Sequence, residues 1–330
     1  MVVEVILVGA ATLFLLYFMG SNAAGHITGP LVGCRVLKFK KAVIFSAISV
    51  FIGALLQGHV IRAVVGKGIV SNLNIDSLGV VIVLLSAAVW VCVATIFGWP
   101  VSISQSTIGA IIGYGLISHA AINWHRVATI FGGVLLNPIF AAGLTILIYA
   151  GLHKFFPSDD AEKNSMWSIP LLLSTVYASY TLGANTFNSV VGVAANVVST
   201  NWLLIAGTIA LALGIIIFGK RVIKTAGFEV THLNPMTAFI VQLSGALVLH
   251  GFIYLGIPST ATLAVIGSIF GVGVFRKLKD NVQKHSVVQL WQATPSQRKS
   301  TMFRILFAWF VTPLFVAGFS GVAYALIKLI

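Results

Sequence analysis

The amino-acid sequence predicts an all-α polytopic membrane protein built from two inverted repeats with broken or re-entrant helices, and with about 10–12 transmembrane segments. Three observations predict this fold class. First, 58% of the 330 residues are hydrophobic and 8% are charged, whereas an average soluble domain has about 25% charged residues. Second, the apolar residues form continuous runs and not the alternating pattern of a β-barrel strand. Third, two sequence blocks of the first half recur in the second half.

The charges exclude several functional classes. A fold of this size cannot cover a water-exposed surface with so few charges, which excludes a soluble enzyme, a nucleic-acid binder and a disordered protein. The net charge of +13 comes from Lys and Arg that lie mostly in short gaps between apolar runs, the pattern that orients membrane proteins. Cys34 and Cys92 lie in or beside apolar segments and predict neither a disulfide framework nor a metal site. We therefore expect a multi-pass protein of the cell membrane, in contact with the lipid bilayer and with no nucleic-acid partner.

Apolar stretches follow one another along the chain, and a membrane-spanning helix needs about 20 such residues. They cover 2–19, 42–61, 78–98, 100–118, 127–152, 168–182, 202–218, 236–256, 258–275 and 303–328. The first stretch has no basic start and no small-residue cleavage motif, so we interpret it as a span and not as a removed signal peptide. Two further stretches, 20–34 and 183–200, are too apolar for loops and too polar for lipid-facing helices, so we expect helix breaks there.

A polar segment divides the chain into two nearly equal halves. Residues 153–167 contain several charged side chains and form the expected linker between a first transmembrane repeat, 1–152, and a second one, 168–330. Within the second half, residues 276–301 collect Lys and Arg. This segment is predicted to be a basic cytoplasmic loop.

The two halves share two blocks of small and polar residues. Four residues of the first block have counterparts 163 positions later: Tyr17, Gly20, Asn22 and Gly29 correspond to Tyr180, Gly183, Asn185 and Gly192. The second block, 97–116, matches 255–274 at an offset of 158, with seven of twenty positions identical. Matched Gly, Pro and Asn residues are harder to attribute to chance than matched apolar ones, so we infer an internal repeat.

The basic residues indicate how the repeats are oriented. A cluster of Lys and Arg at 35–41 corresponds to the uncharged segment 198–204, and the cluster at 220–224 corresponds to the uncharged segment 57–61. Equivalent loops on one side of the membrane would both be basic. The halves are therefore predicted to be inverted, which is the usual construction of secondary transporters that work by alternating access around a site near the membrane midplane.

Each copy of the second block has a Pro followed by hydroxyl side chains. Pro100 and Pro258 are expected to open short helices, because Pro suits the first helical turn. Four hydroxyl side chains fall in those first turns: Ser102, Ser104, Thr260 and Thr262. Free N–H groups and a partial positive charge at a helix start attract anions. Such hydroxyls also serve as plain helix caps, but their duplication favours an anion site.

Asn22 and Asn185 form the other matched pair, each within an apolar and Gly-flanked stretch. An Asn side chain exposed to lipid would leave its donors unsatisfied, so each must face protein, water or a ligand. A hydrogen bond between helices is the alternative reading. The matched positions favour a ligand site.

These blocks resemble the motifs of the inorganic phosphate transporter (PiT) family of secondary transporters. That family carries a G-A-N-D-x-x-N-x-x-G-like signature and a G-x-P-V-S-T-T-H-like motif in each half. The first signature is matched at 20–23 and again at 183–186, and the second motif at 98–105 and more weakly at 256–262. The stretch 219–235 is also similar to a segment of the family. The resemblance covers most of the chain and implies a phosphate transporter.

The chain departs from the family at four motif positions. The family's Asp is replaced by Ala23 and Thr186, and its motif His by Gln105 and Leu263. In the family, those aspartates are tied to sodium and phosphate binding. We expect Thr186 and Gln105, at these positions, to join the paired Asn and hydroxyl residues in binding substrate.

The distribution of acidic residues bears on the coupling ion. All seven acidic residues except Glu4 fall outside the apolar runs, so no carboxylate is expected near the site. This argues against sodium coupling by the family's route and favours a proton. His26 lies inside the first signature block and is the coupling candidate, because His titrates near neutral pH. A neutral His26 that only joins two helices by a hydrogen bond is the alternative.

The sequence therefore predicts a secondary transporter of a tetrahedral inorganic oxyanion. Phosphate is slightly favoured by the resemblance, and a sulfate permease of the same fold is the alternative, because sulfate needs only donors. An anion channel is a remote alternative. A membrane-embedded enzyme would need paired carboxylates, a His-rich metal cluster or a nucleophile with its base, and the spans contain no such set. No cofactor or metal is expected, and a homodimer remains open.

Overall fold

The computed structural model describes residues 2–70, 77–97, 101–157, 164–230, 233–280 and 296–329. This part of the chain is helical, and the one strand-like contact in it is an isolated bridge between Val70 and Ile122. The α-helices are α1 (Val2–Ile27), α2 (Gly29–Gly33), α3 (Phe39–Leu56), α4 (His59–Ala63), α5 (Ser77–Ile96), α6 (Ile103–Ile117), α7 (Trp124–His153), α9 (Ser168–Leu182), α10 (Asn188–Ala194), α11 (Thr200–Val230), α12 (Pro235–Tyr254), α13 (Ala261–Asp280) and α15 (Ser296–Lys328). Two π-helical turns, Val64–Gly68 and Gly183–Phe187, and a 3-10 turn at Ser165–Trp167 complete the described helices.

Eight of the described helices are long and apolar enough to cross a membrane, which confirms a multi-pass membrane protein. They are α1, α3, α5, α7, α11 as far as Lys220, α12, α13 as far as Lys279, and α15 from Trp309. The predicted stretches 100–118 and 168–182 also form helices, α6 and α9, but each has 15 residues. A full span needs about 20 residues. Because α6 and α9 are shorter, they are not counted among the eight membrane-spanning helices.

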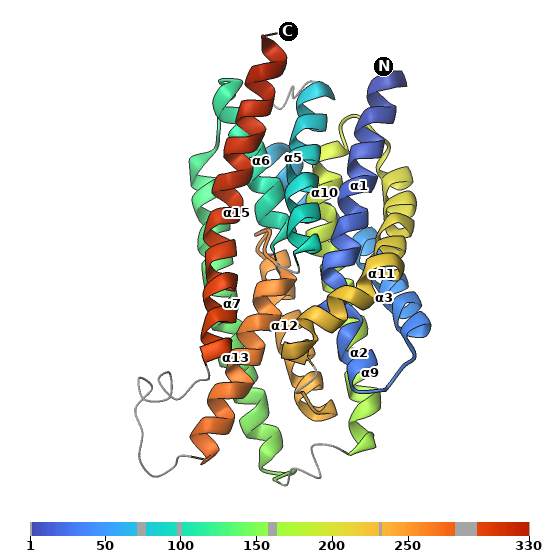
Figure 1. The fold of residues 1–330 in the computed structure, drawn as a ribbon, viewed down its shortest axis with the longest axis vertical. Helices are drawn as coiled ribbons and strands as arrows, with labels where there is room; N and C mark the ends of the chain where they lie inside the picture. The colour runs from blue at the N-terminus through green and yellow to red at the C-terminus, as the bar shows by residue number, and fades with distance from the viewer. Residues whose placement is uncertain are drawn as a thin grey trace.

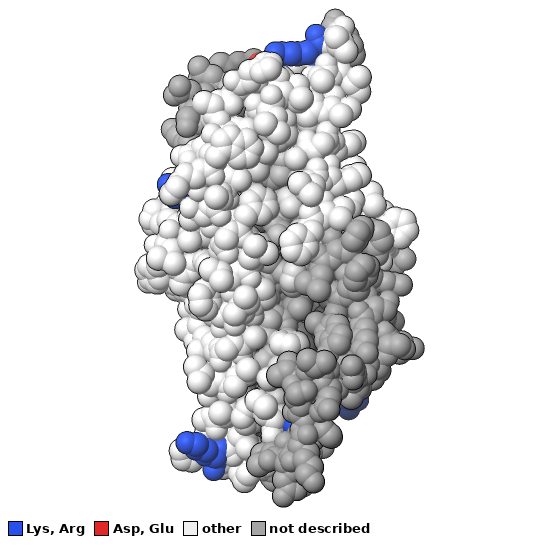
Figure 2. Space-filling model, turned by 90° about the vertical axis from the view of Figure 1, so that its left-hand side faces the viewer, with Lys and Arg blue, Asp and Glu red and all other residues white. Residues whose placement is uncertain are grey.

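The molecular surface agrees with this assignment. Figure 2 shows a face that is free of Lys, Arg, Asp and Glu over most of its height, with the basic residues mainly at the two ends. Many large apolar side chains are exposed along the helices, for example Leu147 of α7 and Leu314 of α15. Lipid tails can cover such side chains, whereas water cannot do so without a large cost in free energy.

The first helix of each half packs on a later helix of the other half. In the first half, α1 lies along α11, and Gly20 approaches so closely that a methyl group on it would lie 2.0 Å from the carbonyl oxygen of Leu211. In the second half, α9 lies along α3, and a methyl group on Gly183 would lie 2.0 Å from the carbonyl oxygen of Val50. Gly20 and Gly183 are the counterparts predicted from the sequence.

A second exchanged pair involves the later helices. The contact of α6 with α15 brings Gly109 against the carbonyl of Pro313, and the contact of α13 with α7 brings Gly267 against the carbonyl of Pro138. Gly109 and Gly267 are again matched positions, 158 residues apart. Close approach of two helix backbones at small residues is the typical way in which membrane helices pack.

The helix breaks differ in detail from the expectation. The first stretch, 20–34, does contain a break, but α1 runs unbroken through Asn22 and ends at Ile27. In the second half the helix is not interrupted at Asn185, because the chain continues through the π-helical turn Gly183–Phe187 into α10. A buried Asn can remain inside a helix when its side chain has partners in the protein, and sequence composition alone does not reveal those partners.

Two predicted helix starts and two predicted loops are also corrected. The helix α6 begins at Ile103 after the cap residue Ser102, and α13 begins at Ala261, so Pro258 precedes the helix and does not open it. Pro100 lies outside the described residues.

The predicted loop 276–301 is shorter at both ends, since α13 continues to Asp280 and α15 begins at Ser296. The predicted linker begins inside α7, which ends at His153, and its residues 158–163 are outside the described part.

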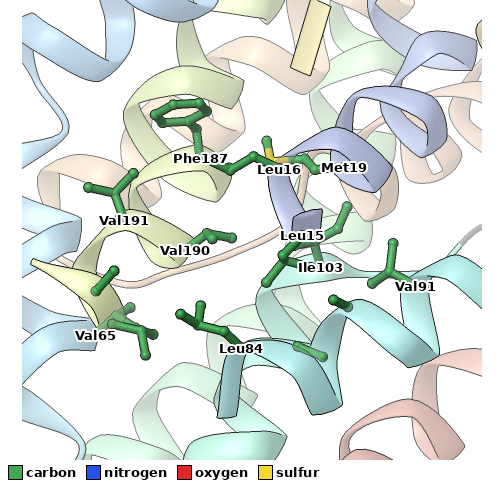
Figure 3. Packing of buried hydrophobic residues seen from close by; sticks show 14 of the residues in the cluster. Leu15, Leu16, Met19, Val65, Leu84, Val91, Ile103, Phe187, Val190 and Val191 are labelled. Carbon is green, nitrogen blue, oxygen red and sulfur yellow. The ribbon is translucent and has the colours of Figure 1, made fainter. Parts of the chain in front are cut away.

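The largest apolar core packs around the turn Gly183–Phe187, which contains the second copy of the signature motif. Figure 3 shows side chains of α1 facing those of α5, α6, α10 and the adjoining π-helical turn. The labelled members include Leu15, Leu16, Met19, Leu84, Val91, Ile103, Phe187, Val190 and Val191, all of them buried. This packing fixes the position of the π-helical turn Gly183–Phe187 and hence of the polar side chains that it carries.

Candidate functional site

The start of α6 and the residues just before α13, one from each half of the chain, meet inside the molecule. We call these two segments the joined loops. In Figure 1, α5 and α6 lie in the upper half of the view and α12 and α13 in the lower half. The Ser104 hydroxyl, in the first turn of α6, donates to the Ser259 carbonyl oxygen just before α13 (2.9 Å). The amide nitrogen of Ser259 in turn donates to Asn185 Oδ1 (3.3 Å). The structure thus joins Ser104 and Asn185, both predicted from the sequence, through the backbone of Ser259.

The loop before α13 is held by a residue that the sequence analysis did not select. Asn137 of α7 is buried, and its Nδ2 donates to Ser259 Oγ (2.7 Å) and to the carbonyl oxygen of Thr260 (2.9 Å). Gly256 allows the turn that follows α12, because it adopts a positive φ of 63°, which Gly tolerates without steric cost. The signal for Asn137 was partial, since it is an Asn within an apolar stretch but lacks the Gly-flanked counterpart in the other half that selected Asn22.

Several polar atoms around the joined loops have no hydrogen-bond partner in the described part of the chain. They are Asn185 Nδ2, Thr186 Oγ1, Gln105 Oε1 and Asn137 Oδ1, and all four residues are buried. A buried polar group without a partner costs about 1–3 kcal/mol. Each such group in a folded protein calls for an explanation, and a ligand that hydrogen-bonds to it is one. Together these atoms supply two donors, Asn185 Nδ2 and Thr186 Oγ1, and two amide oxygens as acceptors.

The remaining predicted residues take different positions. Ser102 caps α6 by accepting a hydrogen bond from the Gln105 amide nitrogen (3.2 Å), which is the capping role that the sequence left open. Thr260 and Thr262 are buried at the start of α13. Asn22 is buried in α1, which contacts both α10 and α13. The structure therefore links Ser104 and Asn185 through Ser259, whereas Asn22 is placed only by the contacts of its helix.

The π-helical turn Gly183–Phe187 is stabilised by a second side-chain network. Asn188 Nδ2 donates to the carbonyl oxygens of Gly183 (2.7 Å) and Ala54 (3.2 Å). Asn188 Oδ1 accepts from Arg62 Nη1 (2.8 Å). Single π-helical turns are rare and occur frequently at functional sites, and here the turn carries both Asn185 and Thr186.

Arg62 of α4 brings a positive charge into this second network, through its contact with Asn188. Its side chain is partly buried against α3 and α10. Glu4, at the start of α1, is the only carboxylate among the side chains that the structure describes. A guanidinium group without a carboxylate partner favours anions nearby. The sequence analysis missed Arg62 because it directly follows an apolar stretch, where a basic residue is ordinary.

His26, the predicted coupling residue, lies one helical turn after Asn22. Its carbonyl oxygen accepts from Gln242 Nε2 of α12 (2.5 Å), while its ring Nε2 has no partner among the described residues. The structure shows no hydrogen bond between the ring and the joined loops. The side chain therefore neither forms the predicted interhelical hydrogen bond through Nε2 nor contacts the other site residues through that atom.

Comparisons with known proteins agree with the fold and the motifs. A family model described as the phosphate transporter family matches residues 19–172 and 156–321. A relative from Bacillus subtilis, named a probable low-affinity inorganic phosphate transporter, is 26% identical over 95% of this chain and 94% of its own length. A relative of the same name from Rhizobium meliloti is 28% identical over 82% of this chain and 85% of its own length.

Other matches differ in length or identity. A relative from Helicobacter pylori, named a phosphate permease, is 25% identical, and the match covers 78% of this chain but 66% of the relative. A solved structure of a protein named "The sodium-dependent phosphate transporter" superposes with a TM-score of 0.83 over 99% of this chain and all of that chain, with 20% sequence identity. At this identity the likeness shows that the two share a fold.

Proposed function

Because this chain belongs to the phosphate transporter family, we propose that it is a secondary transporter that carries inorganic phosphate across the cell membrane by alternating access, together with protons. The family is one of transporters and not of enzymes. The proposed substrate site is shared by the two halves of the chain. Its residues are Asn22, Asn185, Thr186, Ser102, Ser104, Gln105, Thr260 and Thr262.

One observation carries the proposal: the starts of α6 and α13 meet beside the signature block, and buried polar atoms there lack partners. The Ser104–Ser259–Asn185 contacts join the two helix starts. A phosphate bound there would accept hydrogen bonds from Asn185 Nδ2 and Thr186 Oγ1, which are otherwise unpartnered in the described structure. Helix starts add N–H donors and a partial positive charge for the anion.

The acceptor at Gln105 favours phosphate over sulfate. Phosphate near neutral pH keeps a proton and can donate a hydrogen bond, whereas sulfate has none to donate. Gln105 Oε1 is a buried acceptor without a donor among the described residues. A site whose polar groups match one ligand and are left unpaired by another can discriminate between them by orders of magnitude. This supports phosphate ahead of the sulfate alternative.

The exchanged packing of the halves supports inverted repeats and alternating access. Gly20 and Gly183 make the same type of backbone contact with the opposite half, as do Gly109 and Gly267. Such matched contacts are expected when two equivalent bundles are related by a two-fold axis in the membrane plane. Rocking one bundle against the other would expose a site between them first to one side of the membrane and then to the other.

Charge favours a coupled cation, and the site chemistry favours a proton. Moving an anion toward a negative interior costs about 2.3 kcal/mol per charge per 100 mV, so concentrative uptake needs a cation. Glu4 is the only described carboxylate and lies at the start of α1, so sodium would have to rely on neutral oxygens. The transporter of similar structure is named as sodium-dependent. That dependence belongs to the other protein, and it makes sodium the necessary comparison.

The test is uptake of labelled phosphate into proteoliposomes that contain the purified chain. We expect an inward proton gradient to drive accumulation, a sodium gradient at equal pH to have no effect, and a large excess of unlabelled sulfate to leave most of the uptake. Uptake driven by sodium alone would contradict proton coupling. Labelled sulfate that enters with higher affinity and abolishes phosphate uptake would assign a sulfate permease, and non-saturable conductance an anion channel.

A further inference from the structure

A second polar cluster lies between α9, α12 and the end of α3, away from the joined loops. Its centre is His250 of α12, whose two ring nitrogens both have partners. Nδ1 lies 2.7 Å from the Tyr177 hydroxyl, and Nε2 lies 3.0 Å from Gln57 Nε2. The Tyr180 hydroxyl donates to Gln57 Oε1 (3.2 Å). We define Gln57, Tyr177, Tyr180 and His250 as the His250 cluster.

The donors and acceptors of the cluster define a neutral imidazole. The Gln57 amide nitrogen can only donate, so His250 Nε2 is the acceptor and the ring proton lies on Nδ1. Nδ1–H then donates to the Tyr177 oxygen. Tyr180 completes the network by donating to Gln57 Oε1.

Protonation of His250 can be accommodated by a single rotation. An imidazolium donates from both nitrogens, so the Gln57 amide must turn by half a rotation to present Oε1 to Nε2–H. Its Nε2 then donates to the Tyr180 oxygen, and the Tyr177 oxygen continues to accept from Nδ1–H. One proton is taken up, no bond between heavy atoms changes, and every group keeps a partner in both states. A charged donor makes the stronger hydrogen bond.

Among the described residues, the surroundings of the cluster hold no charge that would fix His250 in one state. The titratable side chains in contact with its ring are Tyr177 and Tyr180 of α9 and Tyr254 of α12. From α4, His59 is exposed and Arg62 is bonded to Ala54 and Asn188 instead.

Near the cluster, the described parts of the other helices packed on α12 also present no charge. Beside Phe252, α7 presents Gly133 and Phe140. The first basic residue of α13 is Arg276, which bonds to Tyr149 of α7. The π-helical turn Gly183–Phe187 and the 3-10 turn Ser165–Trp167 contain no titratable residue. A bound proton would therefore be the charge that this cluster carries.

The His250 cluster is connected to the proposed phosphate site through the end of α3. Gln57 is followed by Gly58, whose Cα lies so close to Asn188 that a methyl group on it would be 1.8 Å from Asn188 Nδ2. That same Nδ2 bonds to the Gly183 carbonyl at the start of the π-helical turn that carries Asn185. Gln57 is therefore the chain neighbour of a residue that packs against the support of Asn185.

We propose that the His250 cluster binds the proton that accompanies phosphate, and that the Gln57 amide turns to accept from the protonated ring. The inference rests on the proposed function and identifies the proton site within it. His26 lacks the matching arrangement, since its Nε2 has no hydrogen-bond acceptor among the described residues. His250 therefore replaces His26 as the residue that takes up the coupled proton.

The experiment compares two transport modes of the full-length chain in proteoliposomes. Exchange of labelled for unlabelled phosphate at equal pH needs no net proton movement, whereas accumulation under an inward proton gradient does. His250→Gln is expected to abolish gradient-driven accumulation while exchange persists. His59→Gln is the matched control, because His59 is exposed and outside the cluster, and it should retain both modes.

A second variant keeps the test informative if His250→Gln does not fold. Gln57→Leu removes the acceptor of the imidazolium Nε2–H, and a hydrogen bond to a charged group is stronger than one to a neutral group. The variant should therefore bind the proton less tightly and shift the pH of half-maximal uptake to lower pH by about one unit. An unchanged pH profile of Gln57→Leu would overturn the proposal.

The outcomes separate this inference from the proposed function. If the unmodified chain exchanges no phosphate, phosphate transport itself is wrong. If it exchanges phosphate but ignores the proton gradient, proton coupling is wrong, and the His250 assignment with it. If the unmodified chain and His250→Gln both accumulate phosphate under the gradient, only the His250 assignment is overturned.

Discussion

The two polar atoms of the Asn185 side chain differ in their surroundings. Its Oδ1 accepts from the Ser259 amide and so ties the second signature to the loop before α13. Its Nδ2 has no partner in the described structure, although the residue is fully buried. One atom of the amide thus fixes the orientation of the other toward the space where an anion would bind.

Removing either signature Asn should therefore impair transport. Asn185→Ala and Asn22→Ala are each expected to lower phosphate uptake about tenfold or more, because a hydrogen bond to a charged group contributes about 1.5–3 kcal/mol. Uptake and the amount of protein in the membrane would be measured on the same cells. Asn164→Ala is the control, since it removes a bond to the Met166 amide at an exposed turn. Near-normal uptake in either signature variant would argue against a shared site.

Gln105 should control the choice between phosphate and sulfate. In Gln105→Leu the acceptor Oε1 is lost, so a bound phosphate keeps an unpaired O–H donor, which costs about 1–3 kcal/mol. The ratio of phosphate to sulfate uptake should fall about tenfold or more. Competition between the two labelled anions measures this ratio directly. A ratio equal to that of the unmodified chain would show that Gln105 does not contact the substrate.

At the scale of elements, the two halves are held together by glycine contacts between helix backbones. A Cβ atom at Gly20 or Gly183 would meet a backbone carbonyl oxygen at 2.0 Å, and neither helix can move away without disturbing its neighbours. The same residues begin the two signature blocks. The presence of Gly at this position in both halves therefore has a packing reason in addition to any role in transport.

Gly20→Ala and Gly183→Ala should both destabilise the fold. Forcing an extra methyl group into a packed contact costs about 1–3 kcal/mol, and the closeness of the backbone places these two at the upper end. Thermal unfolding of the detergent-solubilised chain should show a lower melting temperature for each. Gly143→Ala on the exposed face of α7, with nothing within 4 Å, should leave it unchanged or slightly higher. Equal melting temperatures for all three variants would refute the exchanged contacts.

The sequence predicts the helices better than their interruptions. Hydropathy identifies the spans because each is a long apolar run, and the two repeated blocks contain Asn185 and Ser104, which the structure joins through Ser259. The π-helical turn at Gly183–Phe187 was not predictable, because it depends on Asn188 reaching the Gly183 carbonyl. Asn137 and Ser259 were also missed, since their roles arise only when α7 lies beside the loop before α13.

At the scale of the whole molecule, the site lies where elements of both halves converge. The start of α6 belongs to the first half, and the signature block at Gly183–Phe187 and the start of α13 belong to the second. A substrate bound between them would be released to one side of the membrane or the other when the halves change their relative position. The central claim is therefore that one phosphate site is reached alternately from both sides.

Side-specific labelling of a thiol at position 262 tests this claim most directly. Thr262 lies in the first turn of α13 and is buried, and the chain's two cysteines, Cys34 and Cys92, can be replaced beforehand. In right-side-out and inside-out vesicles, Thr262→Cys is expected to react with a membrane-impermeant reagent from both sides, and phosphate should slow the reaction in both. Reaction from one side only, or a rate that phosphate leaves unchanged, would contradict the account.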